Sequence, residues 1–276
     1  MKTDLVLSTF DADVPHLLDA ARAADEAGFD SVWVYDHFSA SVVAKHWSHH
    51  PFTLLGAIAS VTQRVRLGCL VANVYNRHPV QLASALSTLS SLAPGRIWCG
   101  LGAGAGGGSM FGSEYRTIGR DPEPARQRRL VLAETIGFLR AIWAGDRFDG
   151  EVFSVSASAG VVAAGHAFPP ILIGASTRET ALIGAEHGDG VNLQAGGHEL
   201  VAGDAVFSLV RDVRAATDGR PFDIAVNRDL DLDHRFGGDV ESLIAHGVDR
   251  RTLAIRAPFD LEKVTSIGSR LAEAGL

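Results

Sequence analysis

The stretch Phe29-Asp30-Ser31-Val32-Trp33-Val34-Tyr35-Asp36-His37 joins the end of a helix to a short strand and then to two polar side chains. Gly28, just before it, is placed to end the preceding helix as a C′ glycine does. Residues 31–35 are β-branched and aromatic enough to form an interior strand. Asp36 and His37 therefore come where a strand ends, and in a parallel barrel those ends carry the catalytic residues.

The alternation of strand and helix continues through the whole chain. Apolar stretches of strand length are expected at residues 5–8, 31–35, 65–71, 96–101, 171–173, 190–193, 222–226 and 251–255. A helical pattern follows each of them, and Pro79 suits the first turn of one such helix because first-turn amides have no intrahelical partner. Eight consecutive βα units favour a closed (β/α)8 TIM barrel of the α/β class over an open sheet. An open, Rossmann-like sheet predicts a glycine-rich turn after the first strand, where this chain has Thr9-Phe10-Asp11-Ala12.

Length and composition are those of a soluble globular protein. The chain has 276 residues, of which 46% are hydrophobic and 21% charged. Barrels of this kind take about 250 residues, so we expect one domain spanning 1–276. Residues 145–168 are an irregular excursion, expected to form a loop and a short hairpin over one end of the barrel.

The net charge of −7 disfavours nucleic-acid and anionic-membrane partners, because an acidic surface attracts neither. The first residues have no signal-peptide pattern, and no apolar run is long enough to span a membrane. Cys69 and Cys99 fall inside expected strands, where buried free thiols of a reducing compartment are favoured over a disulfide. These observations predict a cytoplasmic protein that acts on a small-molecule substrate.

Two further strand ends carry features that suit an anionic ligand with a flat ring. Residues 100–108 contain six glycines, and backbone without Cβ atoms can approach a ring or a phosphate closely. After the next strand, Ser176 or Thr177 is placed to cap a helix. Free amides at the helix start, the hydroxyl group and Arg178 together make a phosphate site. The structural alternatives are a mobile loop and an ordinary helix cap.

Histidines gather between residues 37 and 50, which raises the question of a metal. Metallohydrolase barrels place fixed histidine pairs on rigid strands and add acids from later strands. Here three of the four histidines, His46, His49 and His50, lie on an expected loop, and the first strand has no matching H-x-H pair. We therefore expect no metal site.

Six segments, taken in order, resemble the bacterial-luciferase-like superfamily of flavin- and deazaflavin-dependent (β/α)8 oxidoreductases. They are residues 24–37, 64–68, 77–79 with the helix that follows, 95–104, 170–176 and 185–192. Each segment alone is unspecific, but their order along residues 4–193 is specific. Beyond residue 193 the resemblance is limited to the architecture.

The resemblance implies that coenzyme F420 or FMN binds in the barrel mouth. It implies a bulge after the third strand, often with a non-proline cis peptide, mapping here to about residues 72–74. The implied cofactor-binding residues are Ala72, Asn73 and Val74 in that bulge, Gly102, Ala103 and Gly104 along the ring, and Gly174, Ala175, Ser176, Thr177 and Arg178 at the phosphate end. Asp36 and His37 match the acid–imidazole pair beside the reactive ring edge.

Two departures from the family pattern bear on the substrate. Some deazaflavin-dependent dehydrogenases have a glutamate as proton donor after the fourth strand, at the position of Ala105 here. The sugar-phosphate version of this chemistry is therefore not expected. Residues 170–260 contain no lysine, so Arg178 or Arg228 would have to contact the phosphate.

The expected activity is hydride transfer between a reduced deazaflavin or FMN and a small organic substrate. His37 would move a proton, since histidine titrates near neutrality, and Asp36 would orient its imidazole or contact the ring. One alternative is an FMN-dependent monooxygenase that receives reduced flavin from a separate reductase. The other is a barrel that binds a flavin-like ligand without turnover. A homodimer is expected from the family alone, and Trp47, Phe111 and Tyr115 are candidates to line the substrate pocket.

Overall fold

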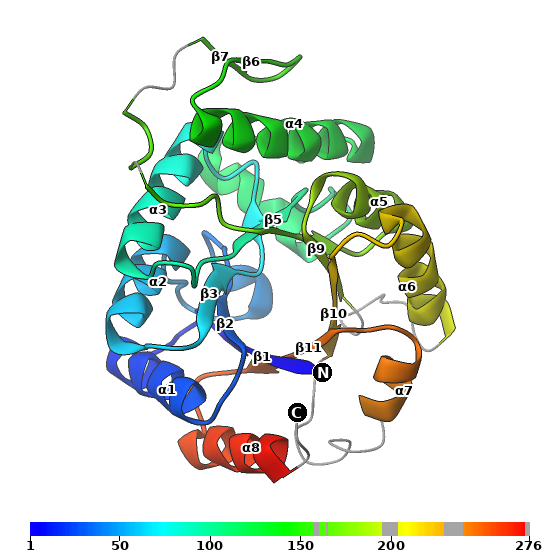
Figure 1. The fold of residues 1–276 in the computed structure, drawn as a ribbon. Helices are drawn as coiled ribbons and strands as arrows, with labels where there is room; N and C mark the ends of the chain where they lie inside the picture. The colour runs from blue at the N-terminus through cyan, green and yellow to red at the C-terminus, as the bar shows by residue number, and fades with distance from the viewer. Residues whose placement is uncertain (157–159, 164, 195–203, 229–239, 274–276) are drawn as a thin grey trace.

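The computed structural model describes the chain except for residues 157–159, 164, 195–203, 229–239 and 274–276. Figure 1 looks along a ring of strands that is surrounded by helices.

The ring is one parallel sheet of nine strands in the order β3-β2-β1-β11-β10-β9-β8-β5-β4. The strands are β1 (Lys2–Leu7), β2 (Ser31–Val34), β3 (Arg66–Cys69), β4 (Ala72–Asn73), β5 (Cys99–Gly102), β8 (Ile171–Ala175), β9 (Gly190–Gln194), β10 (Asp223–Arg228) and β11 (Arg250–Ile255). The ring closes between β3 and β5, where the Leu67 amide donates to the Arg96 carbonyl at 2.7 Å. The Trp98 amide donates in turn to the Leu67 carbonyl at 2.8 Å.

Strands β3 and β4 are two parts of one barrel strand, which leaves eight strand positions. The expected strand at 65–71 is interrupted by a non-proline cis peptide between Leu70 and Val71. β4 then pairs regularly with β5, Ala72 opposite Leu101. The bulge was expected at about residues 72–74, but the cis bond lies just before them. Ala72 and Asn73 have already resumed sheet pairing. The predicted (β/α)8 barrel is confirmed.

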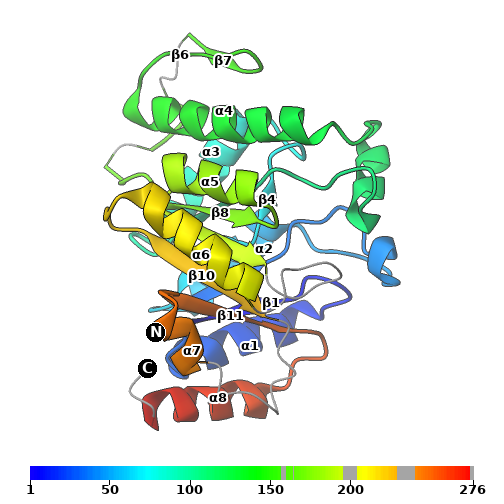
Figure 2. The same ribbon diagram turned by 90° about the vertical axis from the view of Figure 1, so that its right-hand side faces the viewer.

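In the described residues, eight α-helices cover the outside of the barrel (Figures 1 and 2). They are α1 (Val14–Glu26), α2 (Pro51–Val61), α3 (Pro79–Leu92), α4 (Ala125–Ala144), α5 (Arg178–His187), α6 (Asp204–Thr217), α7 (Val240–Ala245) and α8 (Leu261–Glu273), with short 3-10 helices η1 (Ser41–Val43) and η2 (Met110–Ile118). Local sequence explains the bounds of α1: the Asp13 carboxylate accepts the His16 amide at its start, and Gly28, at φ +85°, follows its end.

The interior of the barrel is filled by side chains. Trp33 and Trp98 lie in its centre with their rings 6.1 Å apart. Gly68 is glycine for this reason, since a Cβ there would lie 2.5 Å from the Trp33 ring. At the amino-terminal end, the Arg250 guanidinium forms two hydrogen bonds of 2.9 and 2.7 Å with Asp4. A ligand can therefore enter only at the mouth, where the strands end.

The excursion after α4 contains the predicted hairpin, formed by β6 (Phe148–Asp149) and β7 (Ser154–Val155). The hairpin lies on the outer side of α4, not over one end of the barrel (Figures 1 and 2). The Glu134 carboxylate of α4 accepts the backbone amides of residues 151–153 at 2.7 to 3.0 Å. Phe138 of α4 also packs against Phe148 and Phe153. These contacts explain why the predicted position was wrong.

Cys69 and Cys99 are buried free thiols, as predicted. Burial raises the pKa of both. None of the helices in the described residues is long and apolar enough to cross a bilayer.

Candidate active site at the barrel mouth

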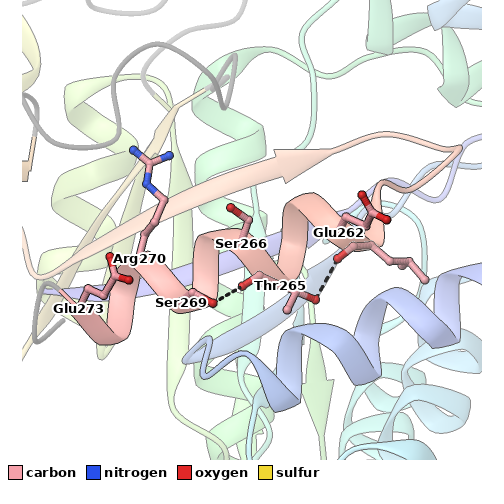
Figure 3. Close-up of a pocket in the computed structure, with 7 residues that line it drawn as sticks. Glu262, Thr265, Ser266, Ser269, Arg270 and Glu273 are labelled. Carbon is pink, nitrogen blue, oxygen red and sulfur yellow. Dashed lines mark hydrogen bonds between the residues drawn. The ribbon is translucent and has the colours of Figure 1, made fainter.

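The candidate site is the end of the barrel at which the strands terminate. In Figure 2 this end faces right, and η1 and η2 lie there in contact with each other. A groove of about 670 Å³ elsewhere on the molecule does not belong to this site (Figure 3). All its lining side chains, from Leu261 to Glu273, come from α8 on the outside of the barrel.

His37 lies at the mouth, directly after β2, as the sequence predicts. Its Nδ1 is 2.9 Å from a carboxylate oxygen of Glu114. Its ring stacks on Phe111 at 4.6 Å and lies 5.2 Å from Phe10. The imidazole is 20% exposed, and Nε2 has no hydrogen-bond partner among the described residues. Glu114 thus favours the tautomer with hydrogen on Nδ1 and leaves Nε2 available to a ligand.

Sequence reasoning missed Glu114. This carboxylate belongs to η2, is only 7% exposed, and also accepts the Ser39 amide at 3.3 Å. The sequence led us to expect that His37 lacks a carboxylate partner, because Ala105 replaces the usual glutamate. That expectation was incomplete, since Glu114, nine residues after Ala105, lies beside the histidine. A signal was present, since Glu114 is the only acidic residue between 103 and 120.

Among the described residues, no hydrogen bond joins the Asp36 carboxylate to the His37 imidazole. Its two oxygens accept hydrogen bonds of 2.7 Å each from the Arg77 guanidinium, and Oδ2 also accepts the Asn73 amide at 2.9 Å. Burial alone would lower the pKa of Arg77, but the bonds to Asp36 raise it above its ordinary value. The prediction that Asp36 orients the imidazole was wrong, because both oxygens of its carboxylate are bonded to the Arg77 guanidinium. Asp36 instead holds the backbone of β4.

Tyr115 connects two of the predicted cofactor segments. Its hydroxyl accepts the Ala105 amide at 3.0 Å and the Asn73 side-chain amide at 3.2 Å. Gly104 lies against it at φ +72°, and a Cβ there would be 2.0 Å from the hydroxyl oxygen. Burial raises the pKa of Tyr115, so the hydroxyl stays protonated. The strand-3 bulge and the glycine turn are thus held together by one buried side chain.

Gly102 and Gly174 are paired on adjacent strands, and both lie against the Val71 side chain. A Cβ on Gly102 would be 2.4 Å from the Val71 side chain, and one on Gly174 would be 2.7 Å from it. Val71 was absent from the predicted site, and the two glycines make room for it. The remaining apolar members of the predicted set are buried in the hydrophobic core, so only their backbone can meet a ligand: Ala72, Val74, Ala103 and Ala175.

The expected phosphate end is only partly assembled. Thr177 caps α5, as predicted, by accepting the Thr180 amide at 3.4 Å, and Ser176 beside it is exposed. Arg178 turns away, because its Nε donates to Asp212 of α6 at 2.6 Å. The predicted role of Arg178 in this phosphate site is not supported by its position. Arg228 ends β10, and its side chain lies outside the described residues.

The histidine-rich loop is anchored by a carboxylate. Asp11 accepts the amides of His46 and Trp47 at 2.9 and 3.0 Å, and its second oxygen is 3.0 Å from the His46 ring. These bonds lower the pKa of Asp11 although its partial burial acts in the opposite direction. In the described part of the chain, no three His, Cys, Asp or Glu residues are grouped to hold a metal.

Comparison with known proteins places this site in a family. The model of the luciferase-like monooxygenase family matches residues 3–232, farther than the predicted limit at 193. The F420-dependent glucose-6-phosphate dehydrogenase of Nocardia farcinica (strain IFM 10152) is 33% identical over 236 residues, 82% of this chain and 66% of that protein. The F420-dependent hydroxymycolic acid dehydrogenase of Mycobacterium tuberculosis (strain ATCC 25618 / H37Rv) is 30% identical, covering 69% of this chain and 52% of its own length. The chain thus spans between half and two thirds of these relatives.

Solved structures share the fold at low sequence identity. An F420-dependent secondary alcohol dehydrogenase, in complex with an F420–acetone adduct, has a TM-score of 0.79 at 17% identity, over 97% of both chains. The coenzyme F420-dependent tetrahydromethanopterin reductase of Methanopyrus kandleri has a TM-score of 0.76 at 15% identity, over 99% of both. With a parallel barrel, a strand-3 break beside the mouth and a family match over most of its length, this chain belongs to the luciferase-like monooxygenase family.

Proposed function

We propose that this protein is an oxidoreductase that uses coenzyme F420 to transfer hydride to or from a small organic substrate. The observation that carries the proposal is the His37–Glu114 pair, which presents a free Nε2 at the barrel mouth. The names of the curated relatives favour F420 over FMN. The F420–acetone complex of a protein with the same fold favours a hydroxyl or carbonyl as the reacting group.

The residues present fit a flat ring. Val71 is half-buried at the mouth, and the glycines beside it, Gly102 and Gly174, place no side chain of their own there. Val71 thus presents an apolar surface against which a ring can stack. Gly107 and Gly108, farther along the turn, have open space where a Cβ would be, so backbone amides are accessible.

In this proposal the bound deazaflavin supplies the hydride acceptor or donor. His37 Nε2 takes the proton from a substrate hydroxyl, or returns it to a carbonyl oxygen in the reverse direction. The Glu114 carboxylate holds Nδ1–H and stabilises the imidazolium that forms. Phe10 and Phe111 flank the ring and exclude water from it, which strengthens the interaction between His37 and Glu114.

The test measures cofactor binding and turnover separately. The purified protein is titrated with F420 and with FMN by fluorescence, and then assayed with short secondary alcohols by the loss of deazaflavin absorbance. We expect tight binding of F420 and turnover that His37→Ala reduces by about 10²–10⁴-fold in kcat. Glu114→Gln should reduce it by about 10–100-fold, a typical effect of losing the partner that orients a functional histidine.

His187→Ala is the matched control, because this histidine lies at the end of α5, outside the candidate site, with its Nε2 3.6 Å from Glu186. It should leave turnover unchanged. Preferential binding of FMN would favour instead a monooxygenase that receives reduced flavin from a separate reductase. Turnover that is insensitive to His37→Ala would exclude this histidine as the proton-transferring group.

Three coarser expectations from the sequence accompany this proposal. We propose that residues 1–276 form one barrel domain, that the protein acts as a homodimer, and that it works in the cytoplasm. The buried free thiols agree with a reducing compartment. Sedimentation of the purified chain tests the dimer.

A further inference from the structure

Arginines are concentrated in one short segment beside the barrel mouth. Residues 116–129 contain five arginines and two acidic residues, a local formal charge of +3 in a chain whose net charge is −7. We call the five the arginine rim: Arg116, Arg120, Arg126, Arg128 and Arg129. The mechanism derived above uses none of them.

The arginine rim adjoins the glycine turn of the site. The Arg128 guanidinium donates to the Gly104 carbonyl, and a Cβ at Gly106 would lie 3.1 Å from its Nη2. Arg120 reaches the carbonyl of Tyr75, just after β4, at 3.4 Å. The segment runs from the end of η2 into the first turns of α4, on the mouth side of the barrel (Figure 2). A cofactor that lies along Gly102–Gly104 would therefore extend toward these arginines.

The five arginines form no ion pair with a carboxylate among the described residues. Other arginines in that part of the chain are paired with an acid, as Arg77 is with Asp36 at 2.7 Å and Arg178 with Asp212 at 2.6 Å. Arg116 and Arg126 are exposed, and their side chains have no hydrogen bond to any described residue. Like charges this close repel one another, and a bound anion would remove that repulsion.

The chemistry of the rim fits a chain of carboxylates better than a single phosphate. A guanidinium pairs with a carboxylate through two parallel hydrogen bonds. The five guanidinium groups are distributed from η2 to the first turns of α4, and one phosphate cannot bind all of them. FMN ends at its phosphate, whereas coenzyme F420 continues beyond its phosphate as a flexible chain of glutamates.

We propose that the arginine rim binds the oligoglutamate tail of a deazaflavin and so selects F420 over FMN. This inference rests on the proposed function, because it needs the ring to lie at the mouth. In the proposed function the ring would lie against Val71 and the phosphate beside Ser176 and Thr177, so the rim would add affinity only for cofactor forms that carry glutamates. Its contribution is electrostatic and therefore sensitive to salt.

The experiment compares F420 carrying several glutamates, F420 carrying none, and FMN, with the whole protein at low and high salt. The variant is Arg116→Gln/Arg126→Gln, whose side chains make no contact that the fold needs. We expect the variant to bind tailed F420 about 3–30-fold more weakly and to bind the tailless form as the wild type does. High salt should weaken the binding of tailed F420 to the wild type and reduce this difference.

Arg147→Gln/Arg211→Gln is the matched control, since it removes the same charge from two exposed arginines outside the rim. It should leave all three affinities unchanged. Equal affinity of the wild type for tailed and tailless F420 would overturn the inference and leave the proposed function standing. Failure of the wild type to bind either form would overturn the proposed function and the inference together.

Discussion

Replacing Tyr115 by phenylalanine should loosen the connection between the strand-3 bulge and the glycine turn. The substitution removes one oxygen atom and keeps the ring, which is 3% exposed and packs edge-on against Tyr75. The Ala105 amide and the Asn73 side-chain amide then lose the acceptor they share. The hydroxyl also donates to the Asn73 side-chain oxygen at 3.5 Å, so the change is confined to the three hydrogen bonds of one hydroxyl at the candidate site.

The magnitude follows from the two donors, the Ala105 amide and the Asn73 side-chain amide, that lose their acceptor. Leaving buried donors without an acceptor costs about 1–3 kcal/mol of unfolding free energy. We take this as the total for both, because Ala105 and Asn73 are only half-buried and water can partly replace the hydroxyl. For a chain of this size each kcal/mol lowers Tm by about 2–4 °C, so we expect Tm to fall by about 2–10 °C.

Thermal unfolding of Tyr115→Phe and Tyr75→Phe measures the effect against a matched control. The Tyr75 hydroxyl is also buried but has no hydrogen-bond partner in the structure, so its removal should be neutral or slightly stabilising. Fluorescence titration with F420 should show weaker cofactor binding for Tyr115→Phe and unchanged binding for Tyr75→Phe. An equal loss of stability in both variants would refute the reasoning, since it would assign the effect to ring packing rather than to the hydroxyl.

Three further perturbations have expected results of definite sign. Gly104→Ala should cost about 1–3 kcal/mol in urea unfolding, because of its positive φ and the nearby hydroxyl, and less than the additive sum when combined with Tyr115→Phe. Arg77→Met leaves Asp36 buried without its cation and should cost about 3–5 kcal/mol, much of which the double variant with Asp36→Leu recovers. Burial raises the pKa of Tyr75 to about 12, so the folded state retains a proton that the unfolded state loses above pH 10. Stability should therefore fall between pH 10 and 12 more steeply in the wild type than in Tyr75→Phe, as alkaline unfolding curves would show.

The strands and helices of the barrel were predictable because each depends on a pattern of consecutive residues. The α1 helix ends at Gly28, and β2 follows as an unbroken apolar run, so both bounds are local. The strand at 65–71 looked continuous for the same reason. Its interruption at Leu70–Val71 has no counterpart in the hydrophobic pattern, since both residues are apolar.

The contacts of the site were less predictable than its location. His37 meets a carboxylate 77 residues away, and Asp36 meets a guanidinium 41 residues away. Nothing in the local sequence distinguishes these partners from the other acids and arginines of the chain. The same holds for Gly102 and Gly174. The sequence does not show whether a glycine makes room for a ligand or, as here, for the side chain of Val71.

The sequence by itself determined the barrel, the position of His37 at a strand end and the family to which the chain belongs. Each depends on periodicity or on ordered local motifs, which survive without knowledge of distant contacts. Only the tertiary structure decided that Glu114, not Asp36, faces His37, and that Asp36 holds β4 through Arg77 and Asn73. Partner choice among charged side chains depends on distance and burial, and both exist only once the strands have closed into a ring.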